Sequence, residues 1–364
     1  MQEEINHIEF IENIIKRKQP FALFRAPGEK APRFLTQTNG GVRLMNDITE
    51  LNGQKGFVIA PFRITKECPV VLIQPDVMEE AFFLPGKEQT ERKGERTISE
   101  SAPDSDRFKE YSNGFSAFIQ ALQNGTFDKL VLSRSLTLDK SASFSPVDAF
   151  MEACRRYIYS YVYLCYTPQT GYWIGGTPEI LLAGAEEEWH TVALAGTQPL
   201  QNGELPLEWD EKNRKEQDYV VSYIRSQLRS LGVDPVEKGP YPAYAGALSH
   251  LKTDFYFSLN KNTGLGDILK LLHPTPAVCG LPKEEAYRFI LQKEGYDRKY
   301  YSGFIGWLHP EGRTELYVNL RCMHIEENQL TLYAGGGILA SSRLEEEWQE
   351  TENKLQTMQR LITH

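Results

Sequence analysis

Short runs of aromatic and β-branched residues recur along this chain, and they constrain its fold more than any other feature. They are bounded by proline and glycine turns, as β-strands usually are. They do not alternate regularly with helical patterns, which argues against a repeated βαβ unit and predicts an α+β fold of layered sheets. The runs lie at 21–24, 56–62, 70–74, 129–134, 161–166, 172–176, 180–183, 191–195, 255–259, 303–308, 315–324 and 330–334.

Apolar residues at helical spacing predict four helices among these strands. They cover residues 5–15, 107–124 and 207–231, and a final one begins near Arg343. Residues 85–106 are polar and nearly free of aliphatic side chains, which predicts a mobile loop. We place it at the end of an N-terminal β-rich part (1–106), before a catalytic region (107–364).

The composition excludes several classes of protein. The 364 residues carry a formal net charge of -9 with both signs mixed along the chain, so no basic face indicates binding to nucleic acid or to a membrane surface. No apolar run approaches the roughly 20 residues that span a bilayer. The acidic N-terminus does not resemble a signal peptide, and five scattered cysteines are typical of reduced thiols. We therefore expect a cytoplasmic protein.

A glycine run followed by an acidic helix is the first candidate site. Gly335, Gly336 and Gly337 predict a turn that offers backbone amides at the start of the last helix. On that helix, Glu347, Glu350 and Lys354 share one face because they are spaced by three and four residues. The pattern fits a divalent metal beside an anion. It fits equally well a solvated face with a Glu350–Lys354 ion pair.

Other candidates are ambiguous when each is taken alone. His273 precedes two prolines one residue apart, which fix a rigid turn, and there it could be structural or functional. Arg321 closes an alternating strand and could bind a carboxylate or pair with a neighbouring acid. Lys129, Glu179 and Glu216, considered singly, are typical of structural or surface residues.

Taken together and in order, however, the motifs resemble the chorismate-utilising enzymes, and among these most of all the isochorismate synthases. The resemblance covers about residues 108–361. It is carried by Lys-Leu-Val-Leu-Ser-Arg (129–134), Thr-Pro-Glu-Ile-Leu-Leu (177–182), Leu-Ala-Gly-Thr (194–197), Leu-His-Pro-Thr-Pro-Ala (272–277), Tyr-Ser-Gly-Phe (301–304), the glycines before Ile338, and Glu-Trp-Gln-Glu-Thr (347–351).

The resemblance implies a fold of large facing antiparallel sheets flanked by helices, like that of aminodeoxychorismate synthase. It also implies a Mg²⁺-dependent isomerase that converts chorismate to isochorismate. In such enzymes water attacks ring carbon 2 while the hydroxyl group leaves carbon 4. Lys129 matches the general base, which must lose its proton well below the usual pKa of about 10.4. Glu179 matches the general acid, whose pKa must be held up.

The remaining matches concern metal and substrate. Glu216 and Glu350 match the Mg²⁺ ligands, and Glu347 matches a residue beside the metal's water. The residues matched to substrate binding are Tyr301 and Arg321 for the enolpyruvyl carboxylate, Lys354 and the amides near Gly335 for the ring carboxylate, and Ala195, Gly196 and Thr197 in the Leu-Ala-Gly-Thr motif. His273 matches a residue near the reacting face, and we expect it to position the substrate.

The resemblance also ranks the alternative functions. Aminodeoxychorismate synthases with a covalent mechanism carry a lysine where this chain has Ala195, so we expect neither amine transfer nor a glutaminase partner. A salicylate synthase, which makes isochorismate and then eliminates pyruvate, is the main alternative. A non-catalytic chorismate-binding protein is a lesser one. We favour a monomer, and the motifs leave open whether the product feeds menaquinone or siderophore synthesis.

Overall fold

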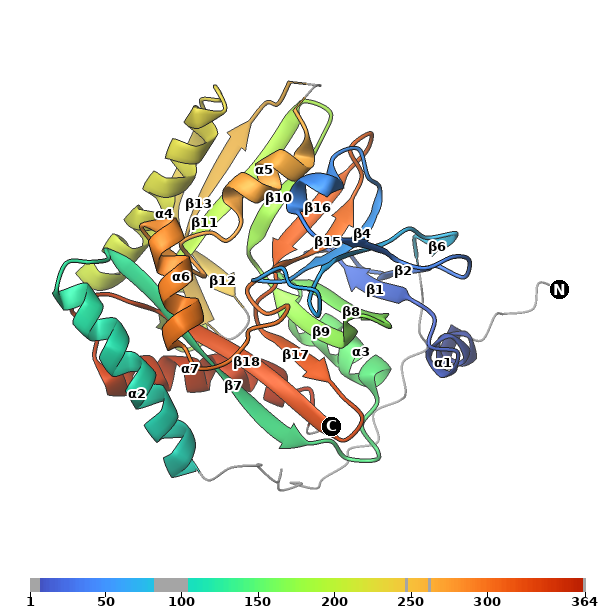
Figure 1. Cartoon of the computed structure of the whole chain (residues 1–364), viewed down its shortest axis with the longest axis horizontal. Helices are drawn as coiled ribbons and strands as arrows, with labels where there is room; N and C mark the ends of the chain where they lie inside the picture. Colours follow the sequence, from blue (N-terminus) through green and yellow to red (C-terminus); the bar gives the residue numbers. More distant parts are fainter. Residues whose placement is uncertain (1–6, 82–103, 246–247, 261–262, 363–364) are drawn as a thin grey trace.

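The computed structural model describes residues 7–81, 104–245, 248–260 and 263–362, which form two antiparallel sheets with helices packed on them (Figure 1). This arrangement confirms the predicted α+β class. The helical elements of the described residues are α1 (His7–Lys16), η1 (Ile48–Leu51), α2 (Asp104–Gln123), α3 (Pro146–Arg156), α4 (Glu211–Ser230), α5 (Leu265–Leu272), α6 (Lys283–Lys293) and α7 (Leu344–Gln359).

Each sheet has nine strands. The first has the order β14 (Gly280–Leu281), β7 (Lys129–Asp139), β18 (Gln329–Ile338), β17 (Cys322–Ile325), β9 (Gly171–Thr177), β8 (Tyr161–Thr167), β1 (Phe21–Arg25), β2 (Arg33–Thr36) and β6 (Val77–Glu79). The second has the order β12 (Val236–Ala245), β13 (Leu248–Phe257), β11 (Glu188–Pro199), β10 (Ile180–Ala185), β16 (Thr314–Val318), β15 (Phe304–Leu308), β4 (Gly56–Ala60), β5 (Val70–Ile73) and β3 (Arg43–Met45).

The strands before residue 81 join both sheets. β1, β2 and β6 extend one end of the first sheet, and β3, β4 and β5 complete the second. The predicted N-terminal part (1–106) therefore shares both sheets with the region 107–364. The mobile loop predicted at 85–106 lies outside the described residues as far as residue 103, and α2 already begins at Asp104.

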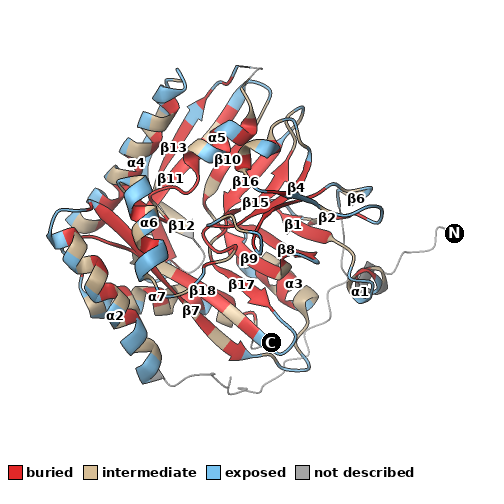
Figure 2. Ribbon diagram, viewed as in Figure 1, coloured by how far each residue is buried: buried red, intermediate tan, exposed pale blue. Residues whose placement is uncertain are grey.

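An aromatic core holds the two sheets face to face. Tyr161 of β8 stacks on Tyr317 of β16 with ring centroids 4.3 Å apart, and Phe24 of β1 contacts Phe57 of β4 at 5.4 Å. Each pair joins strands of different sheets, and all four rings are buried. Figure 2 shows the same burial along the strands. Aromatic pairs of this kind add stabilisation beyond the area that they bury.

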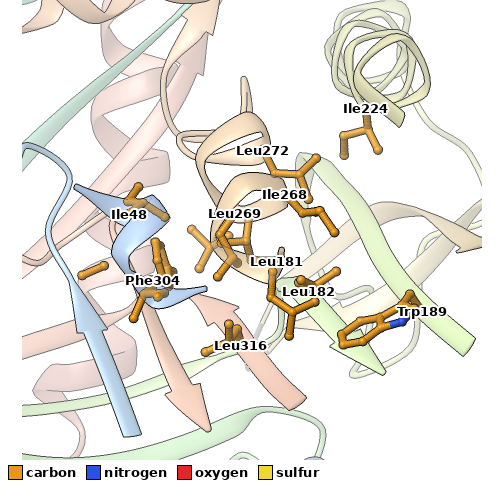
Figure 3. Close-up of a cluster of buried hydrophobic side chains, with 14 of the residues drawn as sticks. Ile48, Leu181, Leu182, Trp189, Ile224, Ile268, Leu269, Leu272, Phe304 and Leu316 are labelled. Atoms are coloured by element: carbon orange, nitrogen blue, oxygen red, sulfur yellow. The ribbon is translucent and has the colours of Figure 1, made fainter. Parts of the chain in front are cut away.

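Helices cover the outer face of the second sheet. In Figure 3, Ile224 of α4 and Ile268, Leu269 and Leu272 of α5 lie against Leu181 of β10 and its neighbours in one buried cluster. At the other end of the molecule α7 packs on β18 and against α2 (Figure 1). No helix in the described part of the chain is both long and apolar enough to cross a bilayer.

Three predicted elements are corrected by the structure. The helix predicted from residue 207 begins at Glu211 because the Asp210 side chain caps it by accepting from the backbone N–H of Asn213. The strand predicted at 315–324 is two strands, β16 and β17, which belong to different sheets. The chain crosses between them at Arg321, which has a left-handed φ of 47°. The glycine run at 335–337 is part of β18 and not a turn, since it pairs with β7.

Candidate active site

A cavity lies between the two sheets beside α4 and α7. The predicted site residues that line it are Glu179, Ala195, Gly196, Thr197, Glu216, Tyr301, Arg321, Gly335 and Lys354. Residues that are far apart in the sequence thus meet in one place, while Lys129, His273, Glu347 and Glu350 lie outside this lining.

Glu179 occupies the short connection between β9 and β10. Its backbone carbonyl accepts from the N–H of Val318, and Thr275 Oγ1 lies 3.4 Å from its Oε1. The carboxyl group is buried, and this burial raises its pKa from 4.5 to about 8 although Lys129 and Arg321 oppose the shift. The group is therefore protonated at neutral pH, as a general acid must be.

Lys129 lies behind the cavity wall as the first residue of β7. Its side chain is fully buried, and Nζ is 3.0 Å from Glu216 Oε1. Burial alone would raise the pKa of the Glu216 carboxyl, but the charges of Lys129 and Lys212 outweigh it and the pKa is lowered. Lys129 is thus connected to the cavity through a charged Glu216.

Because Gly337 has no side chain, it leaves space for the ion pair of Lys129 and Glu216. A Cβ atom added there would lie 2.0 Å from Glu216 Oε1 and 3.1 Å from Lys129 Cε. Both distances are too short for an alanine without movement of the pair. A glycine within a strand costs conformational entropy, and the close approach of these two side chains explains why one stands at this position.

Replacing Gly337 with alanine should therefore displace Glu216 and Lys129 together. We expect the free energy of unfolding to fall by about 1–3 kcal/mol and turnover of the proposed substrate to fall roughly 100-fold, since small misplacements at a reacting centre are costly. Denaturant unfolding and steady-state kinetics measure the two effects. Gly41→Ala is the matched control because a Cβ there meets nothing within 4 Å. Near-native turnover in Gly337→Ala would show that the pair tolerates displacement.

Glu347 and Glu350 converge from α7 on the neighbouring glycine. A Cβ at Gly336 would lie 3.2 Å from Glu350 Oε1 and 3.4 Å from Glu347 Oε2. Burial raises the pKa of Glu347 to about 7, and the charge of Glu350 adds to the rise, although Lys212 opposes it. Lys354, which lies on the same face as Glu350, donates to Glu350 Oε1 at 2.7 Å and to the carbonyl of Gly335 at 2.8 Å.

The carboxylates fit a magnesium ion in their chemistry, although the described residues contain no preformed cluster of three His, Cys, Asp or Glu ligands. Glu347 Oε2 is buried and accepts no hydrogen bond within the described part of the chain. Glu216 and Glu350 lie near adjacent glycines of β18. Mg²⁺ prefers carboxylate oxygens and keeps several waters, so two such ligands are enough.

Arg321 and Tyr301 form another part of the wall. The Arg321 side chain is buried, which lowers its pKa to about 10. Tyr301 stacks on Tyr333 with ring centroids 5.4 Å apart. A guanidinium and a phenol at one wall are suited to hold a carboxylate.

His250 is a lining residue that the sequence did not indicate. Arg321 Nη2 lies 2.6 Å from its Nε2, and because arginine can only donate, Nε2 must accept. Its Nδ1 therefore carries the proton and donates to the carbonyl of Gly196 at 2.8 Å. Burial, with Arg321 and Lys354, lowers the pKa of His250 well below 6.5. A neutral His250 thus orients Arg321.

The Leu-Ala-Gly-Thr segment is held by α4. Gln217 Oε1 accepts from the N–H of Ala195 at 2.9 Å, and Asn213 Oδ1 accepts from that of Thr197 at 2.8 Å. Gly196 between them has a left-handed φ of 69°. The two flanking amides are thus occupied by the protein itself, while the segment still lines the cavity.

His273 is not brought into the cavity. It ends α5, and its ring lies edge-on to Phe304 with centroids 5.3 Å apart. Burial lowers its pKa to about 3, and the charge of Lys283 adds to the shift, so the ring is neutral. Other residues of this proline-rich segment reach the site instead. Ala277 and Val278 line the cavity, and Thr275 contacts Glu179. The predicted contact of His273 with substrate stays a prediction.

Comparisons with known proteins agree with this geometry. A family model described as a chorismate binding enzyme matches residues 47–363. The isochorismate synthase EntC of Escherichia coli is 32% identical over 239 residues, covering 64% of this chain and 61% of that protein. DhbC of Bacillus subtilis, also an isochorismate synthase, is 30% identical over 275 residues, or 70% and 68% of the two chains.

The similarity extends to solved structures. DhbC from Bacillus anthracis superimposes with a TM-score of 0.79 at 25% identity, over 98% of both chains. The match to EntC, in contrast, covers less than two thirds of that relative's length. The sequence match to EntC thus covers 64% of this chain, whereas the similarity in fold to DhbC extends over 98% of it.

Proposed function

Because this chain belongs to the family of chorismate-binding enzymes, we propose that it converts chorismate to isochorismate. The relatives EntC and DhbC, which are named isochorismate synthases, support this activity over others in the family. The reaction is an isomerisation in which water adds at ring carbon 2 and the hydroxyl group leaves carbon 4. It needs a proton acceptor for the water and a proton donor for the departing hydroxide.

The burial of the Glu179 carboxyl group is the observation that carries the proposal. A buried carboxyl group with a pKa of about 8 is protonated at neutral pH and can give its proton to the leaving hydroxide. Lys129 is close enough that its charge opposes this pKa shift more than that of any other residue. We assign Lys129 as the base that accepts the proton of the attacking water.

The role of Lys129 as a base requires that its contact with Glu216, whose Oε1 lies 3.0 Å from Nζ, be released. Glu216 must therefore turn to another cation during turnover. The Lys129 amine would then be a buried group next to the cavity.

Substrate recognition follows from the remaining charges. Chorismate carries two carboxylates, and Arg321 and Lys354 are the cations of the lining that can hold them. Arg321, oriented by His250, would bind the enolpyruvyl carboxylate together with Tyr301. Lys354 would bind the ring carboxylate beside the Gly335 backbone, on which its ammonium group already lies.

We include Mg²⁺ in the proposal, with Glu216 and Glu350 as ligands and Glu347 beside them. When bound, the ion would neutralise these carboxylates and help to hold the substrate's ring carboxylate. Neutralisation by the ion would explain how chorismate, which carries two carboxylates, can bind next to Glu216, Glu347 and Glu350. The protein's own residues still perform both proton transfers.

Product analysis tests the proposal. Purified protein incubated with chorismate and Mg²⁺ is expected to form isochorismate without pyruvate, as measured by chromatography and a coupled pyruvate assay. Salicylate together with an equal amount of pyruvate would instead identify a salicylate synthase. If the protein binds chorismate but does not turn it over, the proposal is wrong and a non-catalytic binding protein is indicated.

A further inference from the structure

The carboxylates beside the glycine run are paired with lysines. Glu216 Oε1 lies 3.0 Å from Lys129 Nζ, and Glu350 Oε1 lies 2.7 Å from Lys354 Nζ. Both lysines already have tasks in the proposed function, as base and as substrate ligand. Glu347 pairs with neither of them.

Glu347 pairs instead with Lys212, which extends from the first turns of α4 toward α7. Lys212 is four residues before Glu216, so the two lie on one face of the helix. Glu347, Glu350 and Glu216 all act on its charge and keep its pKa above the usual value. Lys212 therefore contacts Glu347 directly and lies one helical turn from Glu216, while it is not part of the cavity lining.

Without a positive charge this cluster would be unstable. Glu347 is 1% exposed and Glu216 is 8% exposed, and buried carboxylates without a counter-ion are strongly destabilising. An ammonium group is a compact point charge on a flexible stem, so it can offset several carboxylates and still move away. A divalent cation at the same carboxylates would make it redundant.

We propose that Lys212 is an internal counter-ion that holds the carboxylate cluster together when the divalent cation is absent and competes with that cation for Glu347. The proposal rests on the proposed function, because it takes the cluster to be the Mg²⁺ site. It makes Lys212 a positioning residue that sets the affinity for metal. Lys212 itself transfers no proton and touches no reacting atom.

Removing the charge of Lys212 should therefore tighten Mg²⁺ binding. We expect Lys212→Met to lower the Kd for Mg²⁺ at least about tenfold, since one positive charge facing the site is lost. Isothermal titration calorimetry with MgCl₂, in the absence of chorismate, measures this directly. Without Mg²⁺ the variant should unfold at a lower temperature than the wild type, and saturating Mg²⁺ should restore most of the difference.

Two matched variants separate this effect from general charge and folding effects. Lys215→Met removes a lysine from the same helix, where its side chain is exposed, and should leave the Kd unchanged. Lys212→Arg keeps the charge and should stay within about threefold of the wild-type Kd, which tests the idea even if Lys212→Met does not fold.

The outcomes distinguish the two proposals. Equal or weaker Mg²⁺ binding by Lys212→Met, while the wild type binds Mg²⁺, would overturn the counter-ion role and leave the proposed function intact. The same holds if Lys215→Met changes the Kd as much as Lys212→Met. If neither the wild type nor any variant binds Mg²⁺, the metal site of the proposed function is wrong and the inference falls with it.

Discussion

Replacing Glu179 with glutamine is expected to lower turnover of chorismate by about 100- to 10,000-fold, the usual contribution of a general acid. Glutamine has nearly the same shape but no proton of suitable acidity to give to the departing hydroxide. The 3.4 Å approach of Thr275 and the surrounding packing can be kept, so chorismate binding should change little. Steady-state kinetics and calorimetric titration with chorismate measure the two quantities.

Glu187→Gln provides the matched control, because that carboxylate is exposed in the turn between β10 and β11. It should keep wild-type turnover and binding. If Glu179→Gln also kept near-native turnover, the proton donor would have to be another group. A loss of chorismate binding in Glu179→Gln would assign Glu179 to substrate recognition instead.

The pKa of Glu179 also gives a dependence of stability on pH. The pKa is about 8 in the folded protein and 4.5 for an ordinary glutamate, so the folded state holds this proton more tightly than the unfolded state does. The stability that this confers is present below about pH 4.5 and is lost as the pH rises toward 8. Denaturant unfolding at pH 5, 7 and 9 should therefore show Glu179→Gln gaining stability relative to wild type as the pH rises.

Much of the fold could be predicted because local patterns were strong. The runs at 161–166 and 172–176 became β8 and β9, and the stripe on α4 was evident from its apolar spacing. The prediction of a single strand at 315–324 was wrong because the alternation of side chains continues through the residues that cross from one sheet to the other. The prediction of a turn at the glycine run 335–337 was wrong for a different reason. Three glycines favour a turn locally, but the side chains of Glu216 and Lys129 need the space in β18.

The site could be predicted only where motifs were continuous. The match at 177–182 identified Glu179, whose buried position the sequence could not reveal. His250 was missed because it reaches Gly196 only through the pairing of β11 with β13, and no local signal marks that contact. The role of His273 stays a prediction, since its ring lies outside the cavity lining, whereas Ala277 and Val278 of the same segment line the cavity and Thr275 contacts Glu179.

Lys129→Met is expected to reduce turnover by about 100- to 10,000-fold as well, because the methionine keeps the length of the side chain but cannot accept a proton. It also leaves Glu216 without its partner at 3.0 Å. Breaking a buried ion pair from one side costs up to about 3–5 kcal/mol, and Lys212 should offset part of this because its charge also acts on Glu216. Kinetics and denaturant unfolding of the same preparation measure both effects.

The double variant Lys129→Met/Glu216→Gln separates the base from the ion pair. Removing both charges leaves no unpaired carboxylate, so the free energy of unfolding should return toward the wild-type value while turnover stays absent. Recovery of turnover along with stability would mean that neither the amine of Lys129 nor the carboxylate of Glu216 takes part in the reaction. Stability that recovers without turnover would show that the loss of turnover in Lys129→Met does not come from unfolding, since packing can be restored without an amine but proton acceptance cannot. The single variant Glu216→Gln, which keeps Lys129, then shows how much of the loss belongs to the proposed Mg²⁺ ligand.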